Sequence, residues 1–179
     1  MLKELTTKFL VLIFLFSMIT SSAFALEVSA FKTEEDGEAT ITFCKTLEIK
    51  NVSLNKNSIV QTVVFEKDEG EFENIAILNK NFANHLISCF EGVCDKRTTC
   101  KTSLYSLMSV KKVEDKNLVI AKVSFDRDIS AIFLVSSYKD KNKNKTIYRI
   151  KAPQDFKFLN SKYKKNFRNW LIKETKDLL

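Results

Sequence analysis

The stretch that decides the fold reads GEFENIAILN from Gly70 to Asn79 and continues as KNFANHLISCF from Lys80 to Phe90. Its first residues are polar and include a glycine, which is typical of a turn, and the short apolar run after them is typical of a strand. The side-chain oxygen of Asn79, or that of Asn81, is suited to accept hydrogen bonds from the unpaired N–H groups at a helix start. The pattern therefore predicts a turn, a strand, a cap and a helix, in that order.

The predicted helix has one apolar stripe, because Phe82, Leu86 and Phe90 recur every four residues with Cys89 beside them. Gly92 follows, at the position where the end of a helix favours left-handed backbone. We expect such a helix to bury its stripe against a sheet.

Residues 1–25 have the features of a secretory signal peptide. Lys3 and Lys8 precede an unbroken apolar run, and the residues AFA at 23–25 supply the small side chains that a signal peptidase reads before Leu26. The alternative is an uncleaved anchor helix, but serine and threonine interrupt the run before the ~20 apolar residues that a membrane span needs. We therefore predict that the chain is exported, to a periplasm or out of the cell, after cleavage.

The chain has four cysteines, and export favours disulfides because thiols tend to pair in oxidising compartments. Cys94 and Cys100 bracket a short polar loop, so we predict a local bridge between them, which leaves Cys44 to pair with Cys89. Together with His85, the cysteines also offer the atoms that zinc prefers. The paired C-x-x-C spacing of structural zinc sites is missing, however, so we predict neither a metal nor another cofactor.

Charge is distributed unevenly along the chain. Residues 26–88 contain six lysines, no arginine and eleven acidic residues, which gives a net charge of −5. Residues 89–179 contain twenty-one basic and ten acidic residues, which gives +11. Such an asymmetry either steers an anionic partner to the basic half or holds the two halves together.

The pattern of the first half returns in the second half. A single pair of similar strands has little meaning, but a shared order of several segments indicates an internal duplication. The alternative is one meander domain with two unrelated helices. The aligned segments are 39–43 with 121–125, 47–53 with 129–135, 58–61 with 146–149, and 77–82 with 158–163.

These patterns predict an α+β fold of two tandem modules, each an antiparallel β-meander followed by a C-terminal helix. Two such modules in one chain are expected to form an intrachain pseudo-dimer, so that the protein is a monomer rather than a homodimer. The predicted organisation is a signal peptide at 1–25, an acidic module at 26–92, a cysteine-containing linker at 93–103 and a basic module at 104–179.

The first half resembles the SpoVG family of septation regulators over most of residues 26–91. The resemblance lies in ATITF at 39–43, in residues 47–54 and above all in a Gly-Glu-Phe-x-x-Ile-Ala core. Family members are small α+β domains of one meander and one or more C-terminal helices, and they form homodimers described as nucleic-acid-binding regulators of cell division or sporulation. The resemblance implies the same module here. The core residues are Gly70, Glu71, Phe72, Ile75 and Ala76.

The sequence also departs from that family. The family's turn before the core is basic and contains proline, whereas residues 66–69 here read EKDE, and the second half has no Gly-Glu-Phe. A signal peptide is also out of character for a cytoplasmic regulator. The fold therefore transfers better than the function does.

The sequence lacks the usual signatures of an enzyme. It has one histidine and three glycines, with no G-x-S-x-G elbow and no glycine-rich phosphate loop. The acidic run at 66–73 lacks the fixed spacing of a calcium loop, which favours a solvated hairpin. We therefore predict a non-enzymatic protein.

The basic half supplies the candidate binding site. On the last helix, Tyr163, Phe167 and Trp170 share an apolar face and the basic residues lie opposite. Basic side chains bind phosphates with release of counterions, so we predict an anionic partner: nucleic acid, an envelope polymer or a membrane surface. The alternative is a structural or protein-interaction module of the envelope, whose lysines only face solvent. The predicted anion-binding residues are Lys139, Lys141, Lys143, Lys145, Lys164, Lys165, Arg168 and Lys176.

Overall fold

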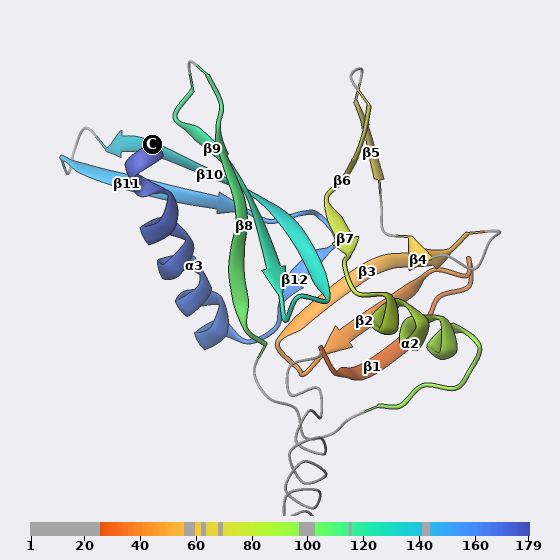
Figure 1. The fold of residues 1–179 in the computed structure, drawn as a ribbon. Helices are drawn as coiled ribbons and strands as arrows, with labels where there is room; N and C mark the ends of the chain where they lie inside the picture. The colour runs from red at the N-terminus through yellow and green to blue at the C-terminus, as the bar shows by residue number, and fades with distance from the viewer. Residues whose placement is uncertain are drawn as a thin grey trace, which may run out of the picture.

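The computed structural model describes residues 26–55, 60–61, 64–67, 70–96, 103–114, 116–140 and 144–179. In this part of the chain, the strands form two five-stranded sheets and a separate hairpin, and two α-helices pack against the sheets (Figure 1). The predicted α+β class is thereby confirmed. None of the helices in these ranges combines the length and the apolar character needed to cross a bilayer.

The first sheet is built mainly from the first half of the chain. Its strands run in the order β1-β2-β3-β12, with β4 also paired to β3, and all pairs are antiparallel. Alternation of buried and half-buried residues along β2 is what a sheet with one covered face requires. The strands are β1 (Val28–Thr33), β2 (Ala39–Phe43), β3 (Leu47–Leu54), β4 (Val60–Gln61) and β12 (Phe156–Phe158).

The second sheet is built mainly from the second half and has the same pattern of connections. Its strands run in the order β11-β10-β9-β8, with β7 also paired to β10. The separate hairpin joins β5 (Val64–Lys67) and β6 (Gly70–Glu73), and it contains the Gly-Glu-Phe part of the family core. The strands of the second sheet are β7 (Ile75–Ile77), β8 (Tyr105–Lys112), β9 (Leu118–Phe125), β10 (Ile129–Asp140) and β11 (Lys145–Lys151).

The two halves exchange a strand. β7 comes directly before the helix of the first half, yet it pairs with β10 in the second sheet, where Ile77 lies opposite Ile129. Likewise, β12 comes directly before the last helix, yet it pairs with β3 in the first sheet, where Phe158 lies opposite Leu47. Each sheet therefore contains one strand from the other half, as Figure 1 shows for β7 and β12.

Matching hydrogen bonds accompany this exchange. The N–H of Leu78 donates to the carbonyl of Asp128 at 2.7 Å, and the N–H of Leu159 donates to the carbonyl of Thr46 at 2.8 Å. At the other end of the exchanged strands, the carbonyls of Asn74 and Asp155 each accept an N–H from the receiving half at 2.9 Å. The exchanged strands are thus held in equivalent positions.

The turns before the receiving strands also match. Cys44 and Lys45 have φ of 47° and 54°, and Asp126 and Arg127 have φ of 49° and 64°. Two consecutive left-handed residues are typical of the tight turns that fit the twist of a β-hairpin. A hydrogen bond closes each turn: the N–H of Thr46 donates to the carbonyl of Phe43, and the N–H of Asp128 donates to the carbonyl of Phe125.

The two receiving strands, β3 and β10, differ in pairing register by one residue. Ala39 lies opposite Val52 in the first sheet, whereas Ala121, its counterpart, lies opposite Phe133 in the second. The extra residue is accommodated by a bulge at Asn51, whose φ is 55°. Beyond the bulge, Val52 therefore corresponds to Phe133.

Both helices begin at an asparagine cap. Helix α2 (Lys80–Phe90) starts after Asn79, whose side chain accepts hydrogen bonds from the N–H groups of Asn81 and Phe82. Helix α3 (Ser161–Thr175) starts after Asn160, whose side chain accepts from Tyr163, and a short 3-10 turn, η1 (Lys176–Leu178), follows it. The predicted cap at Asn79 is confirmed, and Gly92 has the expected left-handed φ of 88°.

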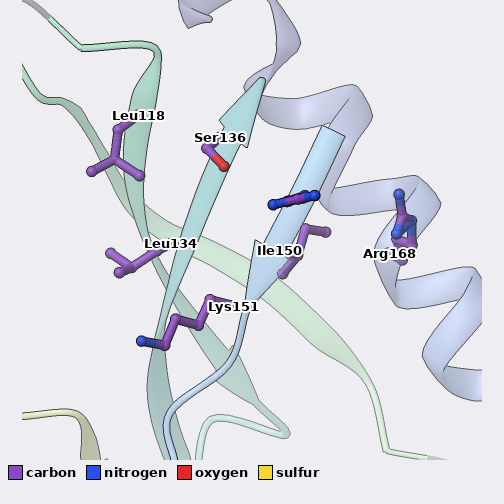
Figure 2. Close-up of a pocket in the computed structure, with 7 residues that line it drawn as sticks. Leu118, Leu134, Ser136, Ile150, Lys151 and Arg168 are labelled. Atoms are coloured by element: carbon purple, nitrogen blue, oxygen red, sulfur yellow. The ribbon is translucent and has the colours of Figure 1, made fainter. Parts of the chain in front are cut away.

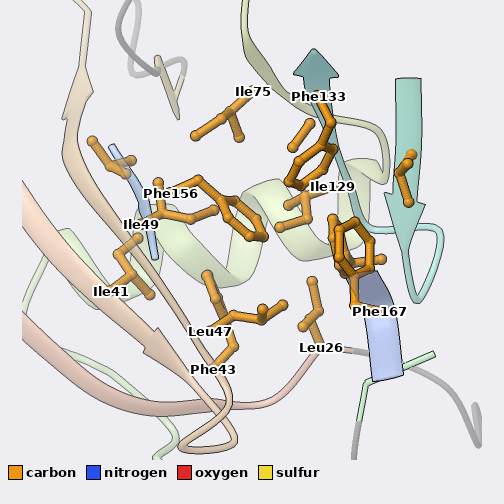
Figure 3. Close-up of a cluster of buried hydrophobic side chains, with 14 of the residues drawn as sticks. Leu26, Ile41, Phe43, Leu47, Ile49, Ile75, Ile129, Phe133, Phe156 and Phe167 are labelled. Atoms are coloured by element: carbon orange, nitrogen blue, oxygen red, sulfur yellow. The ribbon is translucent and has the colours of Figure 1, made fainter. Parts of the chain in front are cut away.

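A single hydrophobic cluster joins the two sheets and the two helices (Figure 3). Helix α2 packs on the first sheet, where its Phe82 ring lies 5.8 Å from that of Phe43. Helix α3 packs on the second sheet, where the Phe167 ring lies 4.8 Å from that of Phe133. Because β12 also brings Phe156 and Phe158 against Phe133, the two sheets share one core.

Candidate anion-binding site

A pocket of about 480 Å³ opens on the second sheet and is lined by strands β9 to β11 and by Arg168 of helix α3 (Figure 2). Its floor is apolar and its sides are basic. Among the residues that the structure describes, no acidic side chain lines it. The lining residues are Leu118, Leu134, Ser136, Arg149, Ile150, Lys151 and Arg168.

The register of the sheet places the pocket side chains next to one another. Ser136 of β10 lies opposite Arg149 of β11 on one side and opposite Leu118 of β9 on the other. Leu134, two residues earlier, lies opposite Lys151. Residues that lie opposite each other project from the same face of a sheet, so these five side chains form two adjacent rows.

The guanidinium of Arg149 is held in place by an aromatic ring. It lies 4.8 Å from the centroid of the Tyr138 ring, and its Nη2 donates to the Tyr138 hydroxyl at 3.4 Å. Cation–π contacts at exposed sites contribute about 0.5–1 kcal/mol, which is enough to bias the orientation of a long side chain. Tyr138 therefore positions one basic wall of the pocket.

Arg168 reaches the pocket from helix α3. Its Nη2 donates to the backbone carbonyl of Tyr148 in β11 at 2.7 Å, which ties the helix to the edge of the sheet. A guanidinium has about five N–H donors in a planar fork, so this bond uses only part of its capacity. Figure 2 shows Arg168 on the helix beside β11, across from the labelled residues of β9 and β10.

Three basic groups around one pocket favour a ligand with several negative charges. A single exposed ion pair contributes about 0–1 kcal/mol, because solvent screens it and the side chains lose entropy. One isolated anion would therefore bind weakly. A polyanion that contacts Arg149, Lys151 and Arg168 together gains several such terms and the release of several counterions.

Of the predicted anion-binding residues, Arg168 is the one that lines this pocket. The predicted lysines at 141 and 143, Lys141 and Lys143, lie outside the described residues. Lys139 and Lys145 are exposed near the tip of the β10–β11 hairpin and do not line the pocket. The remaining predicted residues are exposed on α3 and η1 without lining the pocket: Lys164, Lys165 and Lys176.

Sequence reasoning missed Arg149 and Lys151. Both are on β11, and their two-residue spacing indicates that they share a face of a strand. That signal was available, but it does not say which residues of the neighbouring strands or of α3 they meet. The register with β10 supplies this information.

The first half has no matching basic pocket in its sequence. The predicted alignment of 58–61 with 146–149 is wrong by two residues: Gln61 takes the place of Lys151 rather than of Arg149, because Gln61 lies opposite Ser53 and Lys151 lies opposite Leu134. Ile87 takes the place of Arg168, since each comes eight residues after the asparagine cap of its helix. The basic pocket is therefore a property of the second half.

The predicted disulfide pairing is wrong. Cys89 is bonded to Cys94, so neither the predicted Cys94–Cys100 bridge nor the predicted Cys44–Cys89 bridge forms. The reason is local: α2 ends at Phe90, Gly92 turns the chain back, and the N–H of Val93 donates to the carbonyl of Ser88 at 2.8 Å. This reversal brings residue 94 to within 4.1 Å of residue 89, measured between Cα atoms.

The other two cysteines have different surroundings. Cys44, at the β2–β3 turn, directs its Sγ to the carbonyl of Glu27 at 3.4 Å. Cys100 lies outside the described residues. His85 lies close to the Cys89–Cys94 pair, but sulfurs bonded to each other are not thiolates, which are the form of cysteine that binds zinc. Within the described residues, the arrangement of His85, Cys89 and Cys94 therefore supports a disulfide rather than a zinc centre.

The remaining family-core residues have structural roles. Ile75 is 2% exposed, and with Ala76 it lies in β7, where the two residues pair with Ala131 and Ser130 of β10.

Comparisons with protein-family models, curated proteins and solved structures found no match to this chain.

Proposed function

We propose that this chain is an exported, non-enzymatic protein that binds a polyanion through the basic pocket of its second sheet. One observation carries the proposal: Arg149, Lys151 and Arg168 surround a pocket that no acidic side chain lines in the described part of the chain. The apolar floor formed by Leu118 and Leu134 lowers the local dielectric constant, which strengthens the attraction between these cations and an anion. The ligand chemistry that fits is a chain of phosphodiester groups, as in a nucleic acid or a phosphate-containing envelope polymer.

We also propose that the two halves are copies of one SpoVG-like module and that the chain folds as an intrachain pseudo-dimer. The matching strand order, the exchanged β7 and β12 and the paired left-handed turns support this proposal. In this view, the strand exchange does within one chain what a homodimer interface does between two. A role in septation or cell division follows from the resemblance alone.

A salt titration with matched variants tests the binding proposal. The probes are a fluorescent single-stranded DNA and inorganic polyphosphate, with anionic vesicles to test for a membrane partner. We expect binding at low salt whose affinity falls as salt increases, because each neutralised phosphate adds about 0.7–0.9 to the slope of log affinity against log salt. DNA binding without polyphosphate binding would assign the ligand to nucleic acids.

The pair Arg149→Gln/Lys151→Gln removes two charges from the pocket, and the control pair Lys164→Gln/Lys165→Gln removes two charges from the exposed face of α3. We expect the pocket pair to weaken binding by about tenfold or more and to lower the salt slope by about 1.4–1.8. The control pair should have a much smaller effect. Equal losses in the two variants, or no binding at low salt, would refute the site.

A further inference from the structure

The backbone nitrogen of Leu26 lies in a buried acidic socket. It donates to Oδ2 of Asp128 at 2.6 Å, and the two residues are 102 positions apart in the sequence. Leu26 is 2% exposed and Asp128 is 1% exposed. Leu26 is also the residue that follows the predicted signal-peptidase site, so an independent sequence pattern points to the same nitrogen.

The Asp128 carboxylate accepts neutral donors from both of its sides. Besides Leu26, the side-chain Nδ2 of Asn79 donates to Oδ1 at 2.8 Å. Burial raises the pKa of Asp128 above its ordinary value, the hydrogen bonds from Leu26 and Asn79 lower it, and the nearby charge of Asp126 raises it further. None of the hydrogen bonds to this carboxylate within the described residues comes from a basic side chain. Burying an ionised carboxylate costs much less free energy when a positive charge is paired with it.

The counterpart of this socket in the other half lacks the carboxylate. The N–H of Cys44 donates to the carbonyl of Glu27, and the N–H of Asp126 donates to the carbonyl of Leu104, which makes Glu27 and Leu104 equivalent. Thr46 takes the place of Asp128 there, and its hydroxyl donates to its own turn, to the carbonyl of Phe43 at 3.0 Å. Of these two equivalent positions, only the one that accepts a hydrogen bond from Leu26 carries an acid, Asp128.

We propose that cleavage between Ala25 and Leu26 creates an α-ammonium group on Leu26 that forms a buried ion pair with Asp128. A signal peptidase supplies the chemistry: water adds its hydroxyl to the carbonyl carbon of Ala25, and the C–N bond breaks. The nitrogen of Leu26 leaves with a proton and takes up the proton of the new carboxylic acid, which leaves a carboxylate on Ala25. The step is a hydrolysis without oxidation or reduction. The proposed ion pair depends on the predicted cleavage and not on polyanion binding.

The side chain of Leu26 explains the order of events. It belongs to the shared core, and Figure 3 draws it among Phe43 and Leu47 of the first sheet and Phe167 of α3. A peptidase needs an extended, accessible substrate, so cleavage precedes the packing of Leu26. The new ion pair then ties the mature N-terminus to the β9–β10 turn and, through Asn79, to the start of α2.

The first test identifies the mature terminus. The full-length precursor is produced in a bacterial host that exports it, and the intact mass and N-terminal peptide of the exported protein are measured. We expect the chain to begin at Leu26. A mature protein that begins at any other residue would overturn the proposal.

The second test measures the coupling between the terminus and the acid. Purified chains that begin at Leu26 with a free amino group are compared with chains whose Leu26 amino group is acetylated, each with and without Asp128→Asn. We expect the free amino group to raise Tm by about 3 °C or more, and Asp128→Asn to remove this difference. Asp155→Asn serves as the control, because it changes another buried acid and should leave the difference intact.

The pH dependence gives a third readout. An ammonium whose pKa is raised on folding stabilises the protein below its unfolded pKa of about 8, and this contribution is lost as the pH rises through the folded pKa. The Tm difference between free and acetylated chains should therefore disappear at alkaline pH. Equal Tm values at neutral pH, or a difference that persists in Asp128→Asn, would refute the ion pair.

Discussion

Apart from the β5–β6 hairpin of the first half, the described parts of the two halves have the same arrangement of strands and helices but different chemistry at the same positions. In each half, three antiparallel strands run in sequence, and the third receives a strand from the other half. Lys151 and Arg168 border a pocket in the second half, whereas Gln61 and Ile87 stand in their places in the first. The comparison teaches that backbone pairing and buried apolar positions set the shared architecture, while exposed positions on the same frame are free to carry charge.

The largest expected effect comes from the cores. Phe133 is fully buried and contacts four aromatic rings, those of Phe125, Phe156, Phe158 and Phe167, whereas its counterpart Val52 is a smaller buried residue. We expect Phe133→Ala to lower the free energy of unfolding by about 3–5 kcal/mol, because it leaves a cavity between the sheets and α3. Val52→Ala should cost less, about 0.5–3 kcal/mol. Denaturant unfolding followed by circular dichroism measures both.

Phe133→Leu is the conservative control for this pair and should lose less than Phe133→Ala. If Phe133→Ala and Val52→Ala lowered the free energy of unfolding equally, the second half would not contribute more than the first to the stability of the shared core. That result would contradict the difference inferred from the aromatic contacts.

An intermediate effect is expected at the helix caps. Asn79→Ala and Asn160→Ala each remove a side-chain acceptor from the first turn of a helix, which costs about 0.5–2 kcal/mol. Asn79 also donates to Asp128, so Asn79→Ala should be the more destabilising of the two. Thermal unfolding of the two variants in parallel measures the difference, and a larger loss in Asn160→Ala would contradict it.

The smallest effect is expected at the positions before the exchanged strands, where Asn74 and Asp155 correspond. Burial raises the pKa of Asp155 above its ordinary value, against a lowering by the hydrogen bond from Asn51 and by the charge of Lys50. A carboxyl group whose pKa is raised on folding binds its proton more tightly in the folded state. Its ionisation therefore reduces stability as the pH rises from below its unfolded pKa of about 4 to above the folded value.

Asp155→Asn makes the second half like the first at this position. We expect the variant to be slightly more stable than the parent at pH 7, and this advantage to shrink as the pH is lowered through the folded pKa of Asp155. Thermal unfolding across a pH series measures the change. An advantage for the variant that grows towards acid pH would have the wrong sign and would contradict the argument.

Local features were the part of the fold that could be predicted from sequence. The helix at 80–90, its cap at Asn79 and the left-handed Gly92 depend on neighbours within a few residues, and all three are present. The pairing of Cys89 with Cys94 was missed because it depends on how the chain reverses after the helix, which spacing alone does not give. The pocket was found only in part, since Arg168 was predicted and Arg149 and Lys151 were not.

The sequence by itself determined the α+β class, the helix and its cap, and the basic character of the second half. These follow from residue type and periodicity, which act over short distances along the chain. Tertiary structure alone decided that β7 and β12 change sheets, that Arg149 and Lys151 meet Arg168, and that Leu26 meets Asp128. The physical reason is that a three-residue strand fits any open edge with the right register, so its partner is chosen by the packing of the whole core rather than by its own residues.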